Sequence, residues 1–282
     1  MADISAGERV FIVGGIEQGV RNDGRARGDF RPLELEANVV AQADGSARLH
    51  LGSTDVLVGV KVELGSPDSA RPDHGQVLVS VECSSCASPE FKGRGGEGWG
   101  IELASALEAS LVGAPAGGGG LDLAALCLLP GKVAWVVYVD ALVLNDGGNV
   151  LDALSIAARA ALGLTRVYKV ELTMDEGEDP EVELSGEREA APLDVSAVPV
   201  IVTVSQVGAR SVVDLSLEEE PCAAAALSVA VNSAARVVGV TKSGAGGLDP
   251  SLAQEMIEVA QKLAPGIIAT LDAHLRSIPP AD

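Results

Sequence analysis

The chain has 282 residues, 47% of them hydrophobic, and a positive mean hydropathy, which excludes a disordered polymer and allows one large core or two fused halves. Its net charge of −20 excludes a broadly basic nucleic-acid surface, because phosphate contacts need local cations; RNA contact would require a small basic patch. Only three Phe, two Trp and two Tyr are present, which disfavours an aromatic platform for stacking bases.

The first half begins with an amphipathic segment at 3–19, in which Ile4, Val10, Phe11, Val13 and Ile16 could face a partner. Period-two alternation then predicts strands from 33 to 64, with a hairpin turn at Asp44-Gly45. Further patterns predict strands at 77–81 and 133–144, and helices at 101–112 and 151–162, the second apolar almost all round and ended by Gly163.

An acidic stretch separates the two halves. Nine acidic residues and one Arg lie between Glu171 and Glu189, yet the remainder of the chain is still acidic. The expected organisation is an N-terminal helix and turn at 1–31, a first half at 32–170, an acidic linker at 171–193 and a second half at 194–282. Strands are predicted in the second half at 198–205, 211–215, 224–231 and 236–241.

The last helix is predicted to begin at Asp249-Pro250, as cap and first-turn proline, and Pro265 should kink or split it. Its packing face is predicted from helical spacing as Leu252, Met256, Ala260, Leu263, Ile267, Leu271 and Leu275. Each half runs strands and then a helix, which places the chain in the α+β class with an approximate duplication of the fold.

No motif by itself establishes an enzyme. Cys83-x-x-Cys86 has no second ligand pair, and the three histidines are scattered, so no metal site is expected. The glycine-rich stretch at 243–247 lacks the Lys-Ser/Thr ending of a phosphate loop, and no Gly-x-Ser-x-Gly elbow occurs. The carboxylates at 214 and 218–220 could bind Mg²⁺, although such a cluster is more often a solvated turn. Sparse cysteines and no apparent leader favour a reducing intracellular compartment.

Four motifs in order resemble the RNase PH family over about 20–275. They are Arg21-x-Asp23-Gly24-Arg25; Gly-Ser-Ala at 45–47 leading to Leu-Gly-Ser-Thr-Asp-Val at 51–56; Asp140 to Gly148 followed by an Ala-rich helix; and Val-Val-Asp at 212–214 with three glutamates at 218–220. The resemblance implies an RNase PH-like fold of two pseudo-repeated βαβ-type halves, similar to ribosomal protein S5 domain 2, with a C-terminal helix.

The same resemblance implies a place in the six-membered ring of the eukaryotic RNA exosome. Expected partners are other RNase PH-like ring subunits, S1/KH cap subunits and single-stranded RNA threaded through the ring. Expected locations are the nucleus, including the nucleolus, and the cytoplasm, with roles in rRNA maturation and RNA turnover. No cofactor is expected.

Active family members bind phosphate at the start of the Ala-rich helix with an arginine, and the matching stretch here is Gly148-Asn149-Val150. Because valine cannot pair with phosphate, this stretch with Asp214 and Glu220 is interpreted as a vestigial site, and no catalytic residue is expected. The alternative is an active phosphate-dependent 3′-to-5′ exoribonuclease.

Lys92 and Arg94, in a glycine-rich loop, are the predicted RNA contacts. The alternative for them is an ordinary solvated loop, in which the two cations balance Glu90 and Glu97.

Overall fold

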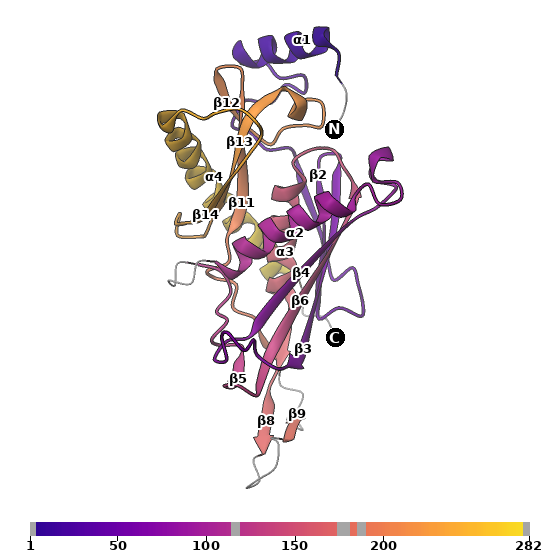
Figure 1. Cartoon of the computed structure of the whole chain (residues 1–282), viewed down its shortest axis with the longest axis vertical. Coiled ribbons are helices and arrows are strands. Elements are labelled where there is room, and N and C mark those ends of the chain that lie inside the picture. The colour runs from indigo at the N-terminus through magenta and orange to yellow at the C-terminus, as the bar shows by residue number, and fades with distance from the viewer. Residues whose placement is uncertain (1–3, 114–118, 174–180, 185–189, 279–282) are drawn as a thin grey trace.

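The chain is described by a computed structural model that covers residues 4–113, 119–173, 181–184 and 190–278. Two sheets enclose one central helix, and further helices cover their flanks (Figure 1). The larger sheet has the strand order β1-β2-β3-β6-β4, with β5 paired to β6. Only the β4–β6 pairing is parallel. Its strands are β1 (Leu33–Ala37), β2 (Gly45–Leu51), β3 (Thr54–Gly65), β4 (Gln76–Cys83), β5 (Cys127–Leu129) and β6 (Val133–Asn145).

The second sheet is antiparallel and has the order β12-β11-β13-β14. Two short strand pairs, β7 with β10 and β8 with β9, connect the halves. The strands are β7 (Arg166–Tyr168), β8 (Val170–Thr173), β9 (Glu181–Leu184), β10 (Ala190–Pro192), β11 (Val200–Val207), β12 (Arg210–Val213), β13 (Ala223–Val231) and β14 (Val237–Ser243). The stretch expected to be a linker at 171–193 thus contains paired strands, although 174–180 and 185–189 lie outside the described residues.

The central helix α3 (Val150–Leu164) is buried from Val150 to Leu162 except at Leu151, as its apolar sequence predicts. It packs on β2 and β3 on one side and on β11 on the other. Gly45 allows this close packing, because a Cβ there would lie 2.3 Å from the carbonyl oxygen of Ala161. Gly163 was expected to end this helix, but the helix continues to Leu164. Gly163 instead makes room for Leu275.

Arg159 joins α3 to the second half from inside the core. It is 1% exposed, and its Nη1 donates to the carbonyl oxygens of Val195 and Val198. Its Nη2 donates to both carboxylate oxygens of Asp272 on α4, at 3.0 and 3.1 Å. Two carbonyls and one carboxylate bind the terminal nitrogens of this buried arginine, although its Nε has no partner within the described residues, and these bonds link α3 to α4.

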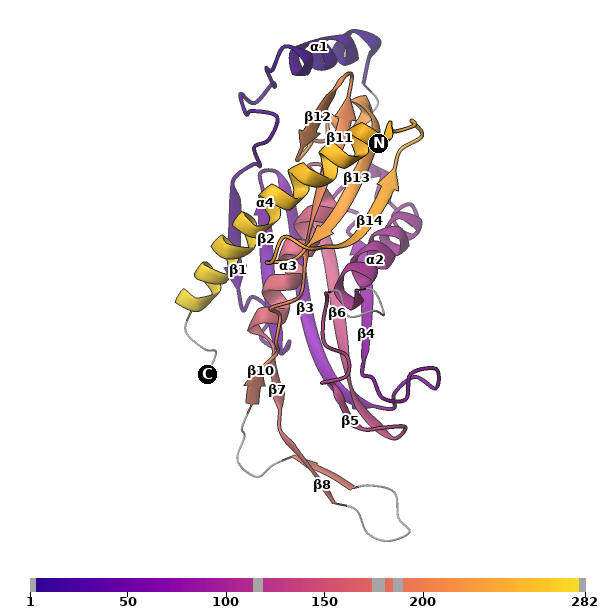
Figure 2. The ribbon, with the colours of Figure 1, turned by 90° about the vertical axis from the view of Figure 1, so that its left-hand side faces the viewer.

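Helix α4 (Pro250–Ser277) lies across the second sheet (Figure 2). Asp249 caps it through a hydrogen bond from the Ser251 amide, as predicted. Pro265 does not split it, because the helix is continuous from 250 to 277. The predicted face is confirmed, because all seven of its residues belong to the core or pack against it. Met256, Ala260 and Leu271 are buried, whereas Leu263 and Ile267 are half-buried beside the fully buried Ala264 and Ile268.

The two remaining helices flank the sheets. Helix α1 (Ala6–Glu17) begins at the predicted segment, and Ile12 and Ile16 pack on Val207 and Leu215 of the second half. Helix α2 (Glu97–Val112) starts four residues before the expected 101 and packs beside β4. Its early glycine is needed because a Cβ at Gly100 would lie 2.5 Å from the carbonyl oxygen of Val81. Within the described residues, no helix combines the length and apolarity that a membrane crossing requires.

Candidate functional site

The segment before β1 brings arginines into the second half of the fold. The Arg21 side chain is fully buried and donates through Nε and Nη2 to the carboxylate of Glu219. It also donates to the carbonyl oxygens of Val213 and Asp214, at 3.1 and 2.8 Å. The first motif of the sequence therefore forms a structural link between residues almost 200 positions apart.

Asp214 is the centre of this link. It is 1% exposed, and its backbone has a left-handed φ of 48°. Its carboxylate accepts hydrogen bonds from the amide, Nε and Nη2 of Arg31, from Nη1 of Arg25 and from Nδ2 of Asn149. Burial alone would raise the pKa of Asp214, but the hydrogen bonds and charge of Arg31 outweigh it and hold that pKa below its ordinary value.

The N-terminus of α3 meets a second carboxylate. The amide of Asn149, which has a left-handed φ of 55°, donates to Oε1 of Glu220 at 2.7 Å. Exposed amides and the helix dipole make such a terminus a site for an anion, so Glu220 supplies that anion from within the chain. Burial raises the pKa of Glu220. Val150, the next residue, is 3% exposed and presents no donor side chain.

Gly148 permits the contact between the halves. Its φ is 89°, and a Cβ there would lie 2.6 Å from the Leu217 amide nitrogen. Its carbonyl oxygen accepts from Arg31 Nη2 and from Thr54 Oγ1. The structure therefore brings together all five residues of the predicted vestigial site: Gly148, Asn149, Val150, Asp214 and Glu220.

Asp152 is a further carboxyl that the sequence patterns did not single out. It is fully buried in the first turn of α3 and accepts hydrogen bonds from the amide and hydroxyl of Thr203 and from Nδ2 of Asn149. Burial is the main cause that raises the pKa of Asp152 to about 7. Arg31 was also missed, whereas Glu219 was noted only as part of the carboxylate cluster at 214 and 218–220. The density of arginines at 21, 25, 27 and 31 in so acidic a chain was the available signal.

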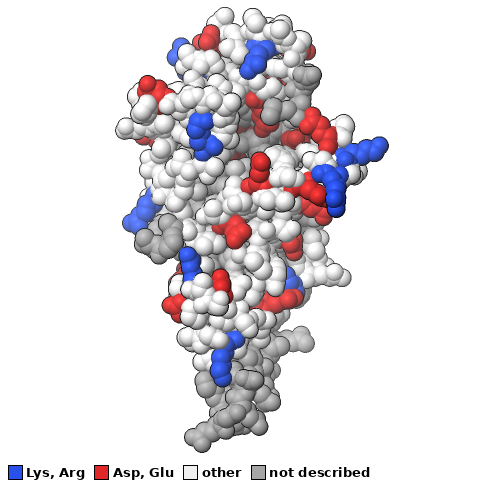
Figure 3. Space-filling model, viewed as in Figure 1, with Lys and Arg blue, Asp and Glu red and all other residues white. Residues whose placement is uncertain are grey.

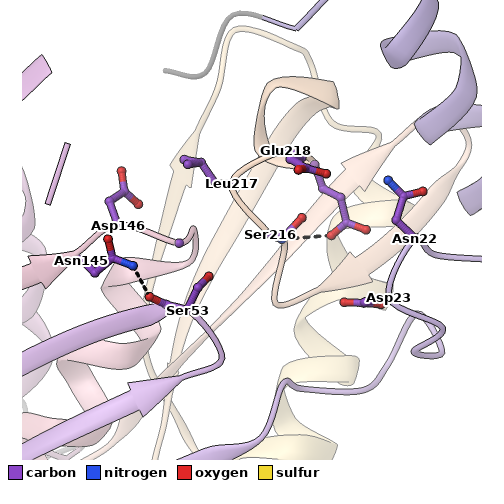
Figure 4. A pocket seen from close by; sticks show the side chains of 10 residues that line it. Asn22, Asp23, Ser53, Asn145, Asp146, Ser216, Leu217 and Glu218 are labelled. Carbon is purple, nitrogen blue, oxygen red and sulfur yellow. Dashed lines mark hydrogen bonds between the residues drawn. The ribbon is translucent and has the colours of Figure 1, made fainter. Parts of the chain in front are cut away.

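A pocket of about 430 Å³ opens beside these residues, between the turn before β1 and the ends of β2 and β6. Figure 4 shows Asn145, Asp146 and Ser53 on one side and Asn22, Asp23 and Glu218 on the other. Carboxylates contribute four of its lining residues, Asp23, Asp146, Glu218 and Glu219, and no Lys or Arg lines it. Glu219 is paired with Arg21 and Asp23 with Arg25, so Asp146 and Glu218 present the pocket's negative charge to an entering anion. Within the described residues, no group of three or more His, Cys, Asp or Glu is arranged to hold a metal ion.

Lys92 and Arg94 lie on the loop between β4 and α2, outside that pocket. The loop starts at the same end of the sheet, because the Ser84 amide donates to the carbonyl oxygen of Val143 near the end of β6. Phe91 stacks on Trp99 with ring centroids 5.2 Å apart and anchors the loop to α2. Both cations are exposed, and Arg94 forms a 3.4 Å ion pair with Glu97. Basic and acidic side chains project together from this edge (Figure 3).

Comparison with known proteins identifies the family. Residues 29–167 match domain 1 of the 3′ exoribonuclease family, RNase PH, and residues 197–262 match its domain 2. An RRP42 exosome protein of Dictyostelium discoideum is 35% identical, covering 99% of both chains. The Rrp42 exosome component of Thermococcus kodakarensis is 38% identical, covering 90% of both chains.

Solved structures agree. A chain from the Archaeoglobus fulgidus exosome, with RNA bound to the active site, aligns with a TM-score of 0.80 and 33% identity over 93% of this chain and 97% of that one. Rice Rrp46, at 17% identity and a TM-score of 0.66, shares the fold. The expected α+β, RNase PH-like fold is confirmed, and the chain belongs to the RNase PH family of 3′ exoribonucleases, among the Rrp42 exosome components.

Proposed function

We propose that this chain is a non-catalytic ring subunit of an RNA exosome, where it scaffolds the ring and helps guide RNA to 3′-to-5′ processing and degradation. The names of its relatives support the ring assignment, and the chain covers nearly the full length of those relatives. Proposed partners are other RNase PH-like ring subunits, S1/KH cap subunits and single-stranded RNA. Proposed locations are the nucleus, with the nucleolus, and the cytoplasm.

The contact between Glu220 and the N-terminus of α3 carries the proposal of inactivity. Phosphorolysis requires a phosphate that is anchored in line with the scissile bond and stabilised by positive groups. Here the Glu220 carboxylate accepts a hydrogen bond from the amide at that terminus, and Val150 offers no charge. Four carboxylates line the adjoining pocket, two of them paired with arginines. The nearby arginines do not compensate, because Arg31 and Arg21 are already bonded to Asp214 and Glu219.

The direct test supplies the full chain with inorganic phosphate, Mg²⁺ and a single-stranded RNA, and measures nucleoside diphosphates. We expect no release above that of a heat-denatured sample. Phosphate-dependent release by the wild-type chain, lost in Glu220→Ala or Val150→Asp, would establish the exoribonuclease alternative and end this proposal. As a complementary measurement, Glu220→Gln combined with Val150→Arg should bind phosphate more tightly than wild type, because it removes the resident anion and adds a cation.

RNA guidance is proposed for Lys92 and Arg94. In a chain of charge −20, two exposed cations on one projecting loop are a place where phosphates would be tolerated. We expect Lys92→Glu with Arg94→Glu to leave ring assembly intact, weaken protection of a long RNA by the assembled ring and reduce its salt dependence. Arg210→Glu with Arg236→Glu is the matched control. Equal protection and equal salt slope in both double variants would assign the loop to solvation alone.

Assembly is tested by purifying the native complex at low salt and identifying its members by mass spectrometry. The two outer strands of the second sheet and the exposed Val10 and Phe11 of α1 leave edges and apolar surface that a neighbour would cover. Co-expression with ring neighbours should therefore raise the thermal midpoint of this chain. A stable monomer whose midpoint is unchanged by every candidate neighbour would contradict the ring assignment.

A further inference from the structure

A second pocket, of about 990 Å³, lies at the opposite end of α3 from Glu220. The 15 residues of α3 separate the two by about 22 Å. Its walls are the 38–44 loop after β1, the end of α3, strands β7 and β10 and the last turn of α4; Figure 2 shows these elements side by side. The volume reaches the upper end of the range for ligand pockets, so a short stretch of chain fits into it.

The charge of this pocket is opposite to that of the protein. Its lining contains Lys61, Arg166 and Arg276 but only one carboxylate, Asp44, although the chain carries −20 overall. Lys61 is already paired with Asp44 at 3.0 Å. The exposed guanidinium groups of Arg166 and Arg276 have no hydrogen bond or ion pair with any residue in the described part of the chain. Within the described residues, two cations of this pocket are therefore without a partner.

A purely structural role for these arginines is to complement helix dipoles. Arg166 follows the end of α3 by two residues, and Arg276 lies in the last turn of α4, where cations are favourable. An arginine that capped a helix would donate to its last carbonyl oxygens. Within the described residues, neither side chain makes that bond. The helix dipoles therefore explain why positive side chains lie here. They do not provide acceptors for the N–H groups of the two guanidinium groups within the described residues.

Apolar and aromatic residues also line the pocket, beside the polar Asn38 and Gln42. Tyr168 is 46% exposed, and Val40, Leu164, Leu275 and Ile278 are half-buried. Guanidinium groups bind carboxylates through two parallel hydrogen bonds, and Tyr and Arg are frequent anchors at protein interfaces. We propose that this pocket docks an extended segment of another protein that carries a carboxylate flanked by apolar side chains.

RNA fits the pocket less well than such a segment. A threaded strand needs repeated cations and stacking rings, whereas the described residues of the pocket offer three cations, one of them paired with Asp44, and one aromatic side chain. The net charge of −20 opposes a continuous phosphate chain. At physiological salt charges are screened beyond about 8 Å, so one or two carboxylates can still reach the arginines. The proposal does not depend on catalytic inactivity or on ring membership.

The test selects random twelve-residue peptides displayed on phage against the immobilised full chain. We expect enrichment of peptides with Asp or Glu next to Leu, Ile, Val or Phe, and at least tenfold weaker binding of these peptides to Arg166→Glu with Arg276→Glu. The matched control is Arg210→Glu with Arg236→Glu, which makes the same change of net charge at two exposed arginines, one in β12 and one just before β14. The control should bind like wild type, and both variants should keep the wild-type circular dichroism and ring assembly.

Three results would overturn the proposal. One is the absence of enrichment, or enrichment without acidic residues. A second is equal binding of the selected peptides to wild type and to the pocket variant. The third is displacement of the peptides by a 20-nucleotide oligouridylate, which would make the pocket part of an RNA path. Ring assembly and RNA protection, measured on the same variants, separate these outcomes from failure of the proposed exosome function.

Discussion

Replacing Asp214 with Asn tests whether its buried ion pairs hold the two halves together. The carboxylate accepts three hydrogen bonds on Oδ2 and two on Oδ1. An amide in either orientation would turn its NH₂ group toward donors, and Arg31 would lose its counter-ion while 8% exposed. Breaking a buried pair from one side costs about 3–5 kcal/mol, a large share of the roughly 5–15 kcal/mol that stabilises a typical domain.

The measurement is urea unfolding of the full chain followed by circular dichroism, with Arg94→Gln as control. Arg94 belongs to an exposed pair that should contribute only about 0–1 kcal/mol. Because the pKa of Asp214 in the folded chain lies below the ordinary 3.8, its contribution is complete above that pH and is lost as pH falls through the folded pKa. The difference between wild type and Asp214→Asn should therefore shrink below pH 3.8. A free energy of unfolding for Asp214→Asn equal to that of Arg94→Gln would refute the reasoning.

Three other outcomes are expected in the same unfolding assay. The pKa of Asp152, raised to about 7, means that ionisation opposes folding, so wild type should lose stability relative to Asp152→Asn as pH rises from 3.8 to about 7; an equal difference at pH 5 and pH 8 would contradict this. Leu154→Ala, at a fully buried position of α3, should cost about 2–5 kcal/mol, and a cost below about 1 kcal/mol would mean that the core collapses around it. Gly148→Ala should cost more than about 1 kcal/mol through its positive φ and the nearby Leu217 amide, whereas Gly98→Ala, with open space, should not; similar costs for both would disprove the steric argument.

Helices and strands whose apolar residues recur with a clear period were predicted from the sequence. The way in which these elements pack against one another was not. The N-terminus of α4 was predicted correctly because a capping Asp followed by a first-turn Pro marks the start of a helix by local geometry alone; these residues are Asp249 and Pro250. The packing face of this helix was predicted from the helical spacing. The depth of burial along that face was not, because only packing on the sheet makes Ala264 more deeply buried than Leu263. Gly163 was misread for a similar reason, because its role depends on Leu275.

The site was predicted as a set of residues but not as a set of interactions. Family motifs pointed to Asn149, Asp214 and Glu220. They could not show that Arg31 bonds Asp214 or that Glu220 meets the α3 terminus, since these partners are separated by 183 and 71 residues and leave no local pattern. The buried role of Asp152 was not predicted, because a single acidic residue in the first turn of an Ala-rich helix is ordinarily explained by the helix dipole.

The link between Arg21 and Glu219 also sets an order of events during synthesis. Arg21 leaves the ribosome 198 residues before its partner, which at about 5–20 residues per second is a delay of roughly 10–40 s. Until then Arg21 and Arg31 lack the carboxylates of Glu219 and Asp214, and α1 has no β11–β12 surface to cover its buried isoleucines. The nascent first half must therefore wait with its N-terminal segment undocked. Chaperone contacts mapped on stalled nascent chains should concentrate on residues 4–31 and disappear once residue 222 has emerged.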